Sequence, residues 1–102
     1  MTSESITLRA YAIEFGTLYG ARHFWPQEGT NNPSTTNPRL WLKQDSAQDA
    51  IHHLRRAAPG NTGWVSKTVR RVYEGCKSTF GSMEEGFPRV VEVEITVLND
   101  CQ

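Results

Sequence analysis

The chain lacks several features that would identify a class of function. Its two cysteines, Cys76 and Cys101, are too far apart for a CxxC pair or a zinc-finger pattern. No apolar run approaches the roughly 20 residues that cross a bilayer, and the first residues do not combine a basic start with a hydrophobic stretch. A phosphate-binding glycine loop and a nucleophilic serine elbow are also missing from the sequence. We therefore expect no cofactor, no metal site, no membrane segment and a cytoplasmic location.

The chain also lacks net charge. Its 11 Lys and Arg residues balance 11 Asp and Glu residues, so no overall field attracts nucleic acid or an anionic membrane. With 37% apolar and 22% charged residues, the composition is globular rather than disordered. A chain of 102 residues has enough material for one modest core. We expect a single globular domain over residues 1–102.

The clearest structural signal is a strand at residues 90–97. The odd-numbered positions from Val91 to Val97 are apolar, whereas Glu92, Glu94 and Thr96 alternate with them. A period of two places the apolar side chains on one face of an extended chain. The pattern predicts a half-buried strand in a sheet that contacts water on one side.

Further strands are predicted in the first half of the chain. Residues 7–14 and 17–23 are rich in β-branched, aromatic and small apolar types, which indicates a hairpin that turns at Gly16. Residues 26–38 are dense in Pro, Gly, Asn, Ser and Thr and predict a long flexible loop. A loop of this length is either a contact arm or loose. Residues 39–43 then indicate a short third strand.

Helices are predicted from the pattern that follows. Asp45 or Ser46 is suited to cap a helix at 46–57, whose apolar stripe includes Ile51 and Leu54. Apolar residues within 64–76 recur at both helical and strand spacing; we favour a helix there and leave a strand open. Together these elements predict an α+β domain in which a small antiparallel sheet of three to four strands packs on one or two helices. The first helix is expected to pack on the apolar face of the 90–97 strand.

Charge is segregated along the chain. No acidic residue occurs from Ala50 to Tyr73, although this stretch contains many basic residues, and acidic residues dominate after it. Basic groups that converge bind phosphates or an acidic protein surface, and aromatic residues beside them supply anchors. The competing interpretation is two ordinary solvated helix faces. The predicted partner-binding residues are Arg55, Arg56, Trp64, Lys67, Arg70, Arg71 and Tyr73.

The residues that could act in catalysis have no partner residues at a suitable spacing in the sequence. His52 and His53 would project about 100° apart on a helix, so they cannot converge on one metal ion unaided. Cys76 has no histidine beside it and is better explained as a buried packing thiol. Glu92 and Glu94 suit an exposed strand face without any substrate. We therefore predict that the protein is not an enzyme.

The order of the expected elements resembles that of small accessory proteins encoded by bacteriophages. The resemblance rests on the hairpin, the polar loop, the segment Arg39-Leu40-Trp41-Leu42-Lys43, the helix start Ser46-Ala47-Gln48-Asp49-Ala50 and the strand Arg89-Val90-Val91-Glu92-Val93-Glu94. It implies a protein that occupies a host or phage macromolecule in the host cytoplasm, as phage inhibitors of bacterial defence do, anti-CRISPR proteins among them. No functional residue is transferred by this resemblance. A nucleic-acid-binding domain with a basic patch between residues 52 and 71, and a structural virion component, remain alternatives.

Overall fold

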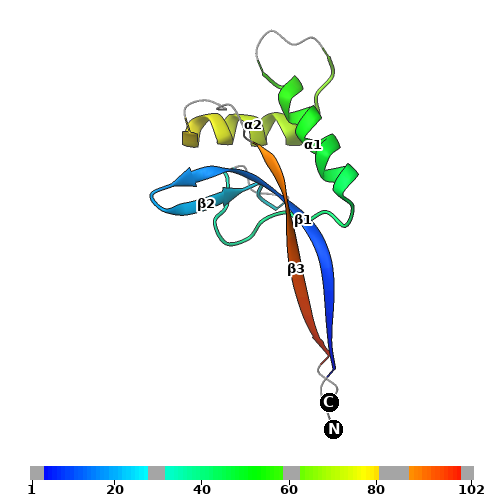
Figure 1. Cartoon of the computed structure of the whole chain (residues 1–102). Coiled ribbons are helices and arrows are strands. Elements are labelled where there is room, and N and C mark those ends of the chain that lie inside the picture. The colour runs from blue at the N-terminus through cyan, green and yellow to red at the C-terminus, as the bar shows by residue number, and fades with distance from the viewer. Residues whose placement is uncertain (1–3, 28–31, 59–62, 81–87, 100–102) are drawn as a thin grey trace.

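A computed structural model describes residues 4–27, 32–58, 63–80 and 88–99 of the chain. Its elements follow the order β1 (Glu4–Leu18), β2 (Ala21–Phe24), α1 (Gln44–Arg56), α2 (Lys67–Phe80) and β3 (Arg89–Asn99). The strands form one antiparallel sheet in the order β2-β1-β3, and both helices lie at one end of the molecule (Figure 1). The predicted α+β fold, with a three-stranded sheet and two helices, is confirmed.

β1 and β3 form a two-stranded ribbon that extends away from the helices (Figure 1). The two strands pair continuously from Glu4 opposite Asn99 to Glu14 opposite Arg89. The strand predicted at 90–97 is therefore confirmed, and it is longer at both ends. The ribbon makes the molecule elongated, with extents of 59 × 31 × 24 Å.

Pairing between β1 and β3 gives the ribbon two different faces. Directly paired residues of antiparallel strands point to the same side, and neighbours along a strand alternate. On one side, which we term the open face, lie Ile6, Leu8, Ala10, Ala12, Val91, Val93, Ile95 and Val97. On the other side, which we term the core face, lie Tyr11, Ile13 and Val90 near the helices and Arg9, Glu92 and Glu94 farther out.

The N-terminal hairpin turns later than the sequence predicts. β1 continues through Gly16, and the chain reverses at Tyr19 and Gly20, whose φ values are 53° and 79°. Two consecutive left-handed residues make a tight hairpin turn, which glycine adopts without strain. The prediction of a turn at Gly16 is therefore wrong.

Gly16 instead follows a β-bulge. The register between β1 and β2 shifts at Phe15, which is the extra residue in β1. A Cβ atom built on Gly16 would lie 3.1 Å from Cε1 of Phe80, at the end of α2. The glycine thus allows the Phe80 ring to pack directly on the strand backbone.

The core lies between the helices and the core face of the sheet. It consists of Ile13, Phe15, Trp25, Ala47, Ile51, Leu54, Val72 and Cys76. Val90 packs against this cluster, together with Tyr11 and Trp41. The predicted contact of α1 with the Val91–Val97 face is wrong, because the helices cover the opposite face of β3.

The segment between β2 and α1 is attached to the sheet at several points. Tyr11 and Trp41 exchange two backbone hydrogen bonds of 2.8 Å, so the strand predicted at 39–43 is reduced to one bridge. In the described part of the predicted loop at 26–38, Ser34 exchanges backbone hydrogen bonds with Phe24, and Pro38 forms a bridge with Pro26.

α1 begins slightly earlier than the sequence predicts. Its first residue is Gln44, and Lys43 occupies the N-cap without a side-chain hydrogen bond. The predicted caps Asp45 and Ser46 therefore lie inside the first turn. There Asp45 still favours the helix, because a carboxylate stabilises the positive end of the helix dipole.

Candidate interaction surfaces

The first candidate surface is the outer side of α2. The helix extends over Lys67–Phe80, so the favoured interpretation of residues 64–76 as a helix holds from Lys67 onward. Its inner side packs on the core through Val72 and Cys76, which are 2% exposed. Residues three and four apart share a helix face, which places Lys67, Arg70 and Arg71 together on the side away from the core. All three side chains are exposed.

No described carboxylate neutralises the three basic groups on the outer side of α2. Lys67, Arg70 and Arg71 make no ion pair with any carboxylate among the residues that the structure describes. Glu74, one turn after Arg70, is exposed but is not within ion-pair distance of it. The outer side of α2 therefore presents a net positive surface to solvent.

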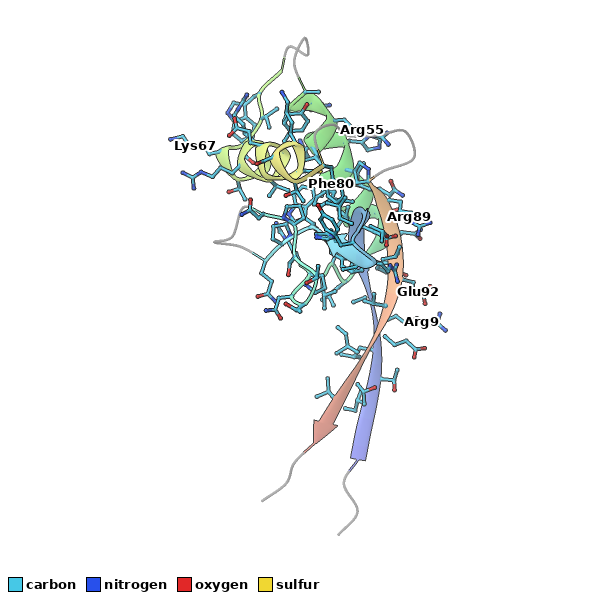
Figure 2. All side chains as sticks on the ribbon, turned by 90° about the vertical axis from the view of Figure 1, so that its left-hand side faces the viewer. Arg9, Arg55, Lys67, Phe80, Arg89 and Glu92 are labelled. Atoms are coloured by element: carbon cyan, nitrogen blue, oxygen red, sulfur yellow. The ribbon has the colours of Figure 1, made fainter. Side chains whose placement is uncertain are left out.

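The structure separates some of the predicted partner-binding residues. Arg55 and Arg56 end α1, where basic side chains stabilise the negative end of the helix dipole. Arg55 and Lys67 lie on opposite sides of the helical layer (Figure 2). The basic residues of the two helices therefore do not all point the same way. The grouped set is the one on α2.

The two predicted aromatic anchors have different surroundings. Trp64, shortly before α2, is 79% exposed. Tyr73 is half-buried and packs against the core cluster. Trp64 is thus available to a partner, whereas much of the Tyr73 ring already stabilises the fold.

A second candidate surface is the open face of the sheet, and its end nearest the helices carries a buried carboxylate. The Glu14 side chain on β1 is 2% exposed and accepts hydrogen bonds from Arg22 on β2 and Arg89 on β3. The distance from Nη2 of Arg89 to Oε1 of Glu14 is 2.7 Å. Hydrogen bonding by Arg22 lowers the pKa of Glu14, and Arg89 acts in the same direction against the effect of burial.

Glu14 fixes two guanidinium groups beside the open face. The side chains of Arg22 and Arg89 remain 55% and 58% exposed while they bind the carboxylate. Arg22 also lies over the Phe24 ring, with its Cζ 5.2 Å from the centroid. The cluster joins all three strands across the sheet.

Sequence reasoning missed this cluster, although one signal was present. Ile6, Leu8, Ala10 and Ala12 form an alternating apolar series, and Glu14 occupies the next position of that series. A carboxylate at a position that alternation marks as apolar must find partners if it is buried. The turn predicted at Gly16 made Glu14 the last residue of a strand, where an exposed carboxylate is unremarkable, and this concealed the signal.

The structure places the sequence's candidates for catalysis on three different elements, α1, α2 and β3. His52 and His53 are exposed on α1, and no group of three or more His, Cys, Asp or Glu residues is placed to hold a metal in the described part of the chain. Burial raises the pKa of the Cys76 thiol to about 11, so it is protonated at neutral pH. Glu92 is paired with Arg9, whose Nε lies 3.4 Å from its Oε1 (Figure 2).

Comparisons with known proteins identify no relative of this chain. No family model matches the chain, and searches of curated proteins and of solved structures give no significant match. Within the described residues, no helix is long and apolar enough to span a membrane. The outer side of α2 and the open face are the two surfaces of the described chain that bear on function.

Proposed function

We propose that the protein is a non-enzymatic binding protein that occupies an acidic macromolecular surface with the outer side of α2. The observation that carries this proposal is the set of exposed cations at Lys67, Arg70 and Arg71, which have no partner among the described carboxylates. Cations without internal partners are available to steer and orient a negatively charged partner. Trp64, exposed just before this helix, adds the kind of large apolar anchor that concentrates binding energy.

The kind of target we propose is a protein of a bacterial defence complex, which the chain would block by steric and electrostatic occupation. This finer proposal is supported by the resemblance to small phage accessory proteins in the order of the elements. Such an inhibitor would act in the cytoplasm of the host cell. It needs no catalytic residue, because occupation of the target surface is sufficient.

Direct binding of nucleic acid is a second candidate. It is favoured by the position of Lys67, Arg70 and Arg71 along successive turns of one helix, where their charges can follow a phosphate backbone. The exposed Trp64 would then stack on a base. The two candidates use the same surface but differ in how binding depends on salt.

The test compares wild type with an Arg70→Glu/Arg71→Glu variant. A partner is first identified by affinity capture from bacterial lysate and mass spectrometry, and the purified partner is then titrated by calorimetry. We expect the variant to bind at least about tenfold more weakly, since two charge reversals remove attraction and introduce repulsion. An Arg55→Glu/Arg56→Glu variant, with the same change in charge on α1, should bind nearly as wild type. Unchanged binding by the α2 variant would refute the proposal.

A parallel titration distinguishes nucleic acid from protein as the target. Single-stranded and double-stranded DNA and RNA are titrated at about 50 and 200 mM salt. If three phosphates are neutralised, affinity for duplex DNA should fall roughly 40-fold over this range. Such a fall would support the second candidate, whereas no binding to nucleic acid at either salt concentration would exclude it.

A further inference from the structure

The open face of the β1–β3 ribbon is apolar and incompletely buried. Ile6, Leu8 and Val97, toward the far end of the ribbon, are 53%, 45% and 43% exposed, and Val91, Val93 and Ile95 are half-buried. Ala10 and Ala12, nearer the helices, are fully buried, so the exposed part of this face is the end away from the helices. The outer part of the core face, by contrast, carries Arg9, Glu92 and Glu94. An amphipathic ribbon of this kind is built to bury one side. Leu40 and Leu42, next to the bridge between Trp41 and Tyr11, add two further exposed leucines, at 41% and 79%.

The molecule exposes more surface than a compact monomer of the same mass. The molecule exposes 7321 Å², whereas a compact monomer of 11.5 kDa exposes roughly 5800 Å². Its radius of gyration is 15.7 Å, against about 13 Å for a compact domain of this length. This excess of about 1500 Å² belongs to the whole elongated chain, both faces of the ribbon included, and a standard stable interface would remove roughly 800 Å² from each partner. An isolated two-stranded ribbon is also only marginally stable in water.

From these observations we infer that two copies of the chain associate through the open faces of their ribbons. A two-fold symmetric contact places the same patch on both sides, so the patch must be compatible with itself. The open-face side chains outside the Glu14 cluster meet this requirement, because none of them carries a charge that would face its own copy. Two ribbons packed about 10 Å apart form a small four-stranded sandwich with a shared apolar interior.

The charged residues on β3 oppose the other obvious mode of self-association. The outer edge of β3 would allow two copies to pair edge to edge. Antiparallel pairing of two β3 strands near their centre brings Glu92 and Glu94 of one copy beside those of the other, and like charges across paired strands are destabilising. Packing through the open face leaves these carboxylates in water. The interface is thus assigned to the face and not to the edge.

This association is independent of the binding function proposed above. The open face lies on the side of the sheet opposite the core, whereas Lys67, Arg70 and Arg71 are on the outer side of α2. A dimer would carry two such helices, both still exposed. Loss of association and loss of target binding can therefore be observed separately, in different variants.

The test is the mass of the full chain in solution, measured by sedimentation equilibrium between about 1 and 100 µM, a range that spans a micromolar dissociation constant. We expect wild type to be dimeric in the upper part of this range. Leu8→Lys places a charge within the interface and should weaken association by at least about 100-fold, which leaves a monomer. Thr7→Lys is the matched control, because it adds the same charge at the neighbouring exposed position on the opposite face. It should remain dimeric.

Two results would overturn the inference. One is a wild-type chain that stays monomeric at every concentration. This result would refute self-association even if the open face were found to bind a different protein. The other is equal dissociation by Leu8→Lys and Thr7→Lys, which would show that the face does not matter. Circular dichroism establishes that each variant is folded; if Leu8→Lys is not, Ile6→Lys, farther from the core, replaces it.

Discussion

Replacement of Ile51 by alanine tests the position of the core. Ile51 is 3% exposed and lies in the core cluster with Leu54 and Ile13. Ile51→Ala removes three carbon atoms, worth about 2.4 kcal/mol at roughly 0.8 kcal/mol for each buried methylene. A cavity of up to about 80 Å³ would add as much as 2 kcal/mol if its walls did not relax. With partial relaxation, we expect a loss of about 3 kcal/mol in the free energy of unfolding.

Val93→Ala provides the comparison that makes this prediction decisive. Val93 is half-buried on the open face and does not belong to the core cluster, and its truncation removes two carbon atoms. We expect a loss of about 1 kcal/mol. Both variants are made in the Leu8→Lys background, so that association does not contribute.

Urea denaturation measures both losses. With an m-value of about 1.5 kcal/mol/M, Ile51→Ala should lower the unfolding midpoint by roughly 2 M and Val93→Ala by less than half of that. The m-value should not change, because both variants unfold the same surface. Equal losses in the two variants would refute the assignment of Val93 to a face that the helices do not cover.

Two further predictions concern buried ionisable groups. Glu14→Gln should destabilise the protein, because the amide cannot replace a carboxylate that binds both Arg22 and Arg89. Since the folded-state pKa of Glu14 is lowered, its contribution is complete above the unfolded-state value near 4.5 and is lost as pH falls through the folded-state pKa. Chemical denaturation from pH 7 to pH 3 should thus show a weaker loss of stability on acidification in Glu14→Gln than in wild type; parallel curves would contradict the cluster. Cys76, with a thiol pKa of about 11, should react with a disulfide reagent at pH 8 only after unfolding. Rapid labelling of the native protein at Cys76, in a variant whose Cys101 is replaced by serine, would contradict its burial.

Much of the secondary structure was predictable because its signals are local. The alternation at 90–97 and the apolar stripe of α1 report periodicities that tertiary contacts then reinforced. The turn was misplaced because Gly16 has a tertiary reason to be glycine, namely the approach of Phe80 from α2. A sequence window that contains only the strand cannot show a contact with a helix so far along the chain.

The sequence also could not show which face of β3 packs against the helices. Alternation shows that Val91 and Val93 share a side of β3 but cannot show which side the helices cover. Val90 packs on the core because its partner on β1 is Ile13, and that register depends on long-range pairing. Likewise, Lys67, Arg70 and Arg71 share one side of α2 because of helical periodicity, whereas the direction of Arg55 relative to Lys67 (Figure 2) depends on how the two helices pack.

The pairing of β1 with β3 also determines how the chain must close on itself. The first contact between the strands, near Glu14 and Arg89, encloses most of the molecule in a loop, and the entropy of that closure costs roughly 4 kcal/mol. Each later pair toward Glu4 and Asn99 encloses no new loop, so the strands can zip outward from the core one step at a time. By the same logic they should fray inward from the far end, where the fewest neighbours hold them. Protection of backbone amides against exchange should therefore rise along β1 from Ile6 to Ile13.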